Sequence, residues 1–178
     1  PFANTGKPLA AGNKNLVIHT EREAFPWRGS ALAIHLIRFL SVLLGATVVY
    51  LTYRLALEVS PQRSDLALAA AALVAFNPMF LFISGSVNND NLIVPLATLI
   101  LWLVVRTLRQ GWLGTGRALL LGLLLGLAAL TKLSGLALLP LTAAVLVVVA
   151  ARRRAWGALF RWGALIAVPV LVVAGWWY

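Results

Sequence analysis

Six long apolar stretches are the feature that most constrains how this chain can fold. They cover roughly residues 31–57, 66–83, 92–108, 117–132, 135–151 and 161–178. A helix needs about 20 apolar residues, with a range of about 17–25, to cross the hydrocarbon of a bilayer. Backbone groups in hydrocarbon must be satisfied internally, and Leu, Ala and Val recur here with helical spacing, which favours helices over a barrel. The sequence therefore predicts an all-α, polytopic transmembrane helix bundle.

The composition supports a membrane protein and argues against several other classes. Hydrophobic residues make up 61% of the chain and charged residues 11%, whereas about a quarter of a soluble domain is charged. The net charge of +10 does not indicate nucleic acid, because the arginines lie at the ends of apolar stretches rather than in a basic, aromatic-rich surface segment. The absence of cysteine excludes thiolate metal sites, and only His19 and His35 offer imidazole. No metal site is predicted, and use of a divalent metal is left open.

The distribution of basic residues predicts the sidedness of the bundle. Short cytoplasmic loops retain Lys and Arg, whereas outer loops lack them. Residues 84–91 contain no basic residue and the turn at 131–134 contains only Lys132, so both are predicted to be extracytoplasmic, together with residues 1–30. Residues 31–178 then form a multi-pass domain in the cell (plasma or inner) membrane. The predicted cytoplasmic connections carry Arg63, Arg106, Arg109, Arg117, Arg152, Arg153, Arg154 and Arg161.

The stretch SGSVNNDN, residues 84–91, places amide and acid side chains between two apolar segments. Asn89 or Asp90 can cap the helix that follows, and Pro95 is tolerated in its early turns. One cap needs only one side chain, so capping does not explain the other amide and acid side chains of this stretch. Asn88, Asn89 and Asp90 are therefore candidate substrate-binding residues, with capping as the alternative interpretation.

Two basic residues allow both a structural and a functional interpretation. Lys132 is the only charged residue between Arg117 and Arg152. It can extend its ammonium group to the interface or stabilise a helix C-terminus, or it can bind the phosphate of a lipid. Arg38 has the same two interpretations. Glu21 and Glu23 are expected to be solvated, although a carboxylate there could act as a general base.

Four small residues, Ala118, Gly122, Gly126 and Ala129, recur every three or four positions. Such a stripe lets a second helix approach closely in a membrane. We expect it to serve packing rather than chemistry.

Three segments resemble consecutive parts of membrane glycosyltransferases of the C-type fold. They are HLIRFLSVLLGATVVYLTYRLA, FNPMFLFISGSVNNDNL and GLLLGLAALTKLSGLALLPL, and the likeness extends over residues 31–178. The chain is most similar to glycosyltransferase family 39, which includes protein mannosyltransferases and aminoarabinose transferases. The resemblance implies an enzyme that passes a sugar from a polyprenyl-phosphate carrier lipid to an acceptor on the extracytoplasmic face.

The resemblance also bears on individual residues. The turn at Asn88 to Asn91 and the Thr131-Lys132 pair match the family, so they would line a vestibule in which Lys132 or Arg38 binds the lipid phosphate. The family's catalytic acid pair follows its first helix. It is expected upstream of Pro1, since Glu21 and Glu23 do not match it, and the chain is expected to be a fragment that is incomplete as a catalyst.

Two other classes remain open at this point. A transporter or flippase would place charges or broken helices near the bilayer midplane. A noncatalytic membrane subunit would need only helices that pack. The sugar, the acceptor and the oligomeric state are not predicted.

Overall fold

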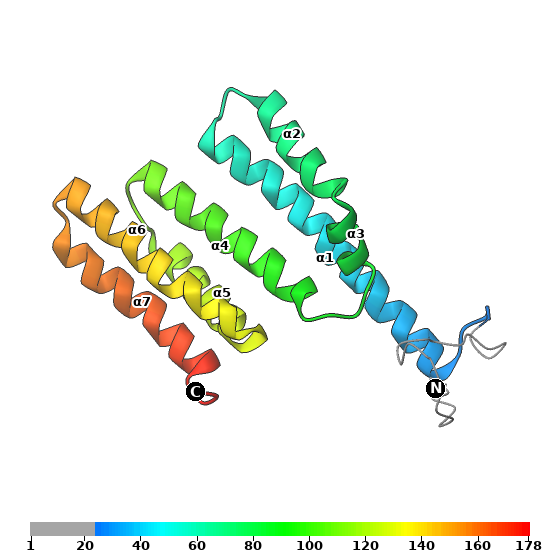
Figure 1. Ribbon diagram of the computed structural model, residues 1–178. Coiled ribbons are helices and arrows are strands. Elements are labelled where there is room, and N and C mark those ends of the chain that lie inside the picture. Colours follow the sequence, from blue (N-terminus) through cyan, green and yellow to red (C-terminus); the bar gives the residue numbers. More distant parts are fainter. Residues whose placement is uncertain (1–23) are drawn as a thin grey trace, which may run out of the picture.

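A computed structural model describes residues 24–178, which form a bundle of helices without strands in that range (Figure 1). One short 3-10 helix precedes the sixth α-helix. The elements are α1 (Gly29–Val59), α2 (Ser64–Ala75), α3 (Pro78–Ser84), α4 (Asp90–Gln110), α5 (Thr115–Thr131), η2 (Leu133–Ala137), α6 (Leu138–Arg153) and α7 (Trp156–Ala174). The prediction of an all-α bundle is confirmed.

The chain runs back and forth, so its connections gather at two ends of the bundle (Figure 1). We call the end formed by residues 60–63, 111–114 and 154–155 the basic end. The opposite end, formed by residues 85–89, 132–137 and 175–178, is the polar end. Helices α1 and α4 run side by side in the same direction, and α5 returns antiparallel to α4.

Several helices are long and apolar enough to cross a membrane. In the described part of the chain these are α1, α4, α7 and the continuous segment Leu133–Arg153. Helix α5 has 17 residues, which corresponds to about 26 Å and is slightly shorter than the roughly 30 Å of hydrocarbon. Helices α2 and α3 together satisfy the same length and hydropathy test as one bent span. The architecture is that of a polytopic membrane protein.

The apolar segment 66–83 is divided into α2 and α3, which are bent by 63° relative to each other. The break lies at Asn77 and Pro78. The side-chain Oδ1 of Asn77 accepts hydrogen bonds from the backbone N–H groups of Met79 (3.0 Å) and Phe80 (3.1 Å), and Pro78 occupies the first turn. An Asn cap followed by Pro starts a new helix well, while Pro ends the preceding one.

The core lies among α4, α5, α6 and α7. Ile100, Leu125 and Trp162 are among its most buried side chains. Helix α5 packs most extensively on α7, and a Cβ added to Gly122 would lie 2.5 Å from the carbonyl oxygen of Ile166. The predicted small-residue stripe therefore serves close helix packing, as expected.

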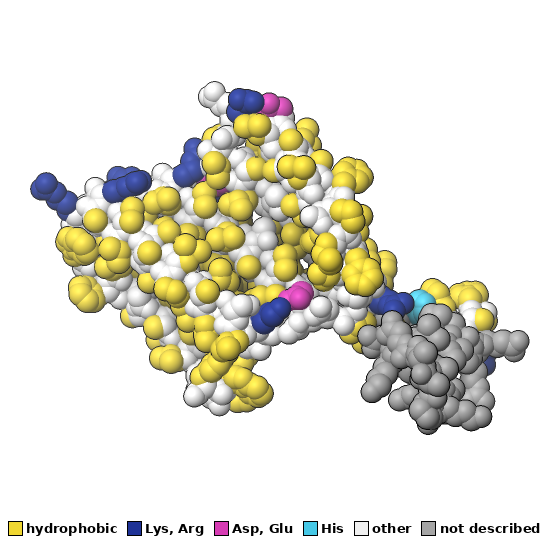
Figure 2. All heavy atoms as spheres, viewed as in Figure 1, with side chains coloured by type: hydrophobic (Ala, Val, Ile, Leu, Met, Phe, Trp, Pro, Cys, Tyr) yellow, Lys and Arg dark blue, Asp and Glu magenta, His cyan; other side chains and the backbone are white. Residues whose placement is uncertain are grey.

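The outer surface of the bundle is apolar on its sides and basic along one edge. Figure 2 shows hydrophobic side chains over most of the lateral surface, and Lys and Arg side chains gathered along the edge at the basic end. Exposed large hydrophobic side chains are numerous in the described residues. A large exposed apolar surface is expected where the solvent is lipid.

Candidate functional site

An ion pair joins two helix ends at the polar end of the bundle. The Nζ of Lys132 lies 2.5 Å from Oδ1 of Asp90. Asp90 is the first residue of α4, and Lys132 directly follows α5. Because α4 and α5 are antiparallel helices of 21 and 17 residues joined by a short connection, their far ends meet and bring these two charges together. The structure therefore unites two of the predicted site residues.

Asn88 holds the carboxylate of Asp90 from the loop side. Its Nδ2 donates to Oδ2 of Asp90 (3.4 Å), and its Oδ1 accepts from the backbone N–H of Asp90 (3.2 Å). Asn89 occupies the N-cap position of α4, yet its side chain makes no capping hydrogen bond. The capping interpretation therefore holds for neither residue, since the two carboxylate oxygens of Asp90 contact Lys132 and Asn88 rather than backbone N–H groups. The exposed side chain of Asn89 remains available to a ligand.

Asn91, expected only as the last residue of the turn at Asn88 to Asn91, has a structural role of its own at the site. It is 8% exposed, and its Nδ2 donates to the backbone carbonyl of Ser86 at 2.6 Å. This bond ties the loop 85–89 to the first turn of α4. The signal in the sequence was only its membership in the polar stretch, since nothing there distinguishes the buried Asn from its exposed neighbours.

Lys132, the basic partner of the ion pair, directly follows α5, and hydrogen bonds hold that end of the helix. The hydroxyl of Tyr178 donates to the carbonyl of Ala129 (2.9 Å), and the hydroxyl of Thr131 donates to the carbonyl of Leu127 (2.7 Å). Ala129 is one of the last four residues of α5, whose carbonyl groups a helix C-terminus otherwise leaves free, so the Tyr178 bond satisfies one of them. Tyr178 therefore supports the position of Lys132 from 46 residues away in the chain. No pattern in the sequence indicates this contact.

Arg38 does not join the cluster. It lies on the exposed part of α1 that precedes the first buried residue of that helix, Ser41. Among residues 24–178, no hydrogen bond or ion pair links Arg38 to Asp90 or Lys132. His35, one turn away, is a packed residue, since its Nδ1 lies 2.8 Å from the carbonyl of Ala31 and its ring stacks on the ring of Trp27. The remaining candidates, His19, Glu21 and Glu23, lie outside the described residues.

A small cavity adjoins the ion pair between α1, α3 and α4. Its volume is about 130 Å³, and Asp90, Asn91 and Ser84 contribute its polar lining. Gly45 on α1 makes room here, because an added Cβ would lie 2.7 Å from Oγ of Ser84. Pockets for small molecules usually measure about 300–1,000 Å³. This cavity can therefore hold water or part of a substrate, and the rest would lie in the open at the polar end.

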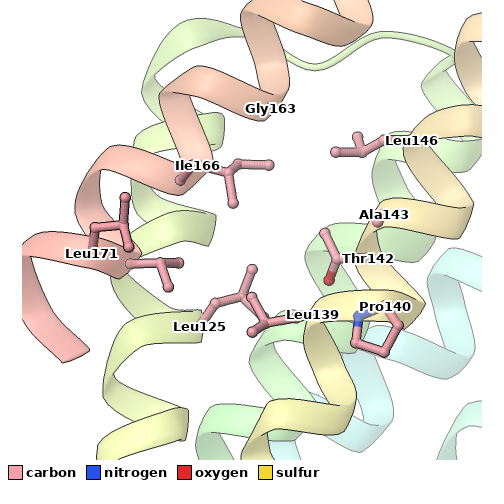
Figure 3. Close-up of a pocket in the computed structure, with 11 residues that line it drawn as sticks. Leu125, Leu139, Pro140, Thr142, Ala143, Leu146, Gly163, Ile166 and Leu171 are labelled. Atoms are coloured by element: carbon pink, nitrogen blue, oxygen red, sulfur yellow. The ribbon is translucent and has the colours of Figure 1, made fainter. Parts of the chain in front are cut away.

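A larger, apolar groove lies between α5, α6 and α7 (Figure 3). Its volume is about 450 Å³, and its lining is aliphatic apart from Thr142. The hydroxyl of Thr142 is buried and has no partner among the described residues. Figure 3 shows Leu125, Leu139 and Ile166 extending into the groove. With no charge in its lining, the groove suits hydrocarbon and offers no catalytic group.

The charged groups at the polar end could bind a phosphate and hydroxyl groups, but they do not form a metal site. No three His, Cys, Asp or Glu side chains converge within the described range. The site offers one ammonium group, one carboxylate and exposed amides. Lys132 retains 41% and Asp90 29% of side-chain exposure, so both can be reached from the aqueous phase.

The fold and this site define a multi-pass helical membrane protein with a polar, charged cluster at one end. Residues 29–178 match the family model described as dolichyl-phosphate-mannose-protein mannosyltransferase. The chain belongs to this family of membrane glycosyltransferases, which confirms the expected relationship at that level. Searches of curated proteins and of solved structures gave no match.

Proposed function

We propose that the protein is a membrane glycosyltransferase that moves a sugar from a polyprenyl-phosphate-linked donor to an acceptor on the extracytoplasmic face. The observation that carries the proposal is the Asp90–Lys132 pair at the polar end, in a chain of this family. Donor phosphate and sugar hydroxyl groups need a cation and polar acceptors or donors close together, at the level of the membrane surface.

In this proposal Lys132 binds the donor phosphate, and Asp90 positions the ammonium group of Lys132. An ammonium group is a point-charge partner for phosphate. Before the donor binds, Asp90 holds the Lys132 ammonium in place through their 2.5 Å contact. The exposed Asn89 can hydrogen-bond to sugar hydroxyl groups, and the exposed Asn88, which uses one N–H donor on Asp90, has a second N–H with which it can do the same. We assign no general-base role to Asp90, because Lys132 and Asn88 already engage its two oxygens.

The charge distribution supports the proposed sidedness. Within the connections that make up the polar end, Lys132 is the only basic residue. The basic end, by contrast, carries a series of arginines in or close to its connections, which favours a cytoplasmic location. We therefore place residues 1–30 and 84–91 outside. The arginines are Arg63, Arg109, Arg117, Arg152, Arg153, Arg154 and Arg161.

The apolar groove gives a place for part of the donor's hydrocarbon chain. Leu139 and Pro140 in its wall lie in the first turn of α6, a few residues after Lys132. A lipid whose phosphate lies at Lys132 would thus have an apolar groove near the same end of the bundle. Arg38, on the exposed part of α1, remains a second candidate for the lipid phosphate or for an interfacial role.

Sugar transfer by the complete protein in membranes, measured with a polyprenyl-phosphate-linked sugar, tests the proposal. We expect Lys132→Met and Asp90→Asn each to lower turnover by about 10- to 100-fold, the range expected when a hydrogen bond to a charged group is lost. Asp65→Asn is the matched control. It removes the exposed Arg63–Asp65 ion pair at the other end of the bundle and should leave transfer unchanged.

The double exchange Asp90→Lys with Lys132→Asp distinguishes binding of the donor phosphate from a purely structural ion pair between two helices. A pair that only braces two helices should regain activity when its charges are exchanged. A pair that binds the donor phosphate should stay inactive, because the cation then sits on the wrong helix. Normal turnover in both single variants would refute the site assignment.

A further inference from the structure

We propose that Arg54, Trp102 and Arg106, near the basic end, form a binding site for the phosphate of an anionic phospholipid headgroup. This site lies on α1 and α4 at the other end of the bundle from Asp90 and Lys132. It is independent of sugar transfer, and its ligand is a lipid of the surrounding bilayer.

The geometry places two guanidinium groups on one aromatic ring. The Cζ of Arg54 lies 5.4 Å and the Cζ of Arg106 lies 5.3 Å from the ring centroid of Trp102. Tyr50 and Arg54 are four residues apart on α1, as are Trp102 and Arg106 on α4. Residues four apart share a helix face. Because α1 and α4 pack side by side in the same direction, the two aromatic–arginine pairs meet at one level.

Neither of the two arginines forms an ion pair with a carboxylate side chain of residues 24–178. That range contains three carboxylate side chains. Each of them has another partner, since Glu58 pairs with Arg109, Asp65 with Arg63 and Asp90 with Lys132. Two like charges held over one ring repel each other, and an anion placed between them would remove the repulsion.

The side chains around the ring offer hydrogen-bond donors. Arg54 donates to the hydroxyl of Tyr50 (2.7 Å), which leaves the Tyr50 O–H proton free to donate. Arg106 donates to no group in the described part of the chain, and the buried Nε1 of Trp102 has no acceptor there. A guanidinium group binds phosphate through two parallel hydrogen bonds. A set of donors beside two cations fits a phosphate better than a neutral ligand.

The position of the site favours a lipid over a soluble anion. Arg54 precedes the end of α1 by five residues and Arg106 precedes the end of α4 by four, which places both about 6–8 Å along the axis from the helix ends. Both arginines are half-buried, and the lateral surface of the bundle is largely apolar (Figure 2). A phospholipid fits both the arginines and the apolar surface, because its phosphate can lie at the arginines while its acyl chains lie along the helices.

Binding of defined lipids to the complete protein in detergent, measured by native mass spectrometry, tests the inference. Phosphatidylglycerol should bind more tightly than phosphatidylcholine, and Arg106→Gln should weaken phosphatidylglycerol binding by about tenfold. Arg152→Gln is the matched control. It removes one exposed arginine of the same end, so it should change binding less than about twofold. Glycerol phosphate alone should not compete at equal concentration.

Arg106→Lys keeps the inference testable if the Gln variant fails to fold. Lysine retains the charge but lacks the planar donor pair, so binding should still fall severalfold. Three results would overturn the inference: equal binding of the two lipids, equal losses in the Arg106→Gln and Arg152→Gln variants, or full competition by glycerol phosphate. Unchanged binding in Arg106→Lys would overturn the guanidinium contact itself.

Discussion

Neighbouring asparagines in the loop before α4 have different physical roles. Asn91 is buried, and its amide satisfies the carbonyl of Ser86. Asn88 orients the carboxylate of Asp90, and the exposed Asn89 makes no capping bond. One residue therefore maintains the loop, one positions the acid, and one is available for a ligand.

Replacing Asn91 should destabilise the protein far more than replacing Asn89. Asn91→Ala leaves the Ser86 carbonyl without its partner, and an unsatisfied buried polar group costs about 1–3 kcal/mol. Asn89→Ala removes an exposed side chain and should change the free energy of unfolding by less than about 0.5 kcal/mol. Both can be measured by unfolding in a denaturing detergent. Equal losses in the two variants would contradict the hydrogen-bond assignment.

The sequence could predict only part of this site. Asp90 and Lys132 are recognisable as rare charges in an apolar chain, and their charge pattern predicts a shared end of the bundle. Their direct contact depends on how far α4 and α5 each extend, which local patterns do not specify. The bond from Tyr178 to Ala129 and the separation of Arg38 from the cluster likewise follow from tertiary packing.

At the scale of helices, α5 derives its position from small residues facing α7. Gly122 lies against the backbone of Ile166, and Gly126 lies against Val173. Helices in a bilayer gain little from excluding lipid, so close van der Waals contact stabilises them. The same spacing of small residues was visible in the sequence, which is why this packing face could be predicted while its partner helix could not.

Adding a methyl group to Gly122 should force α5 and α7 apart. The new Cβ would lie 2.5 Å from a backbone oxygen, which cannot rotate away. We expect Gly122→Ala to lower the free energy of unfolding by about 1–3 kcal/mol. Gly116→Ala, on the same helix with no atom within 4 Å of the added Cβ, should be neutral or stabilising by up to about 1 kcal/mol. A neutral Gly122→Ala would argue against the close α5–α7 contact.

The break between α2 and α3 shows how local chemistry changes an element. Hydropathy alone treats residues 66–83 as continuous. The capping bonds of Asn77 and the backbone restriction imposed by Pro78 divide the segment, with a bend of 63°. The Asn-Pro pair marks the position of the break in the sequence, but the bend angle is set by packing of α3 against α1 and α4.

At the scale of the whole molecule, charge is distributed unevenly between the two ends of the bundle. Basic side chains concentrate at one end, and the Asp90–Lys132 pair with its amides lies at the other. This asymmetry orients a multi-pass protein in its membrane. It also assigns different partners to the two ends, with anionic lipid proposed at Arg54 and Arg106 and a lipid-linked sugar proposed at Lys132.

Labelling of single cysteines tests most directly whether the polar end faces outward. The chain contains no cysteine, so Asn88→Cys and Ser134→Cys can each report on the polar end, and Gly114→Cys on the basic end. We expect a membrane-impermeant maleimide to label positions 88 and 134 in intact cells, and position 114 only after the membrane is opened. Labelling of position 114 alone in intact cells would contradict the proposed extracytoplasmic site.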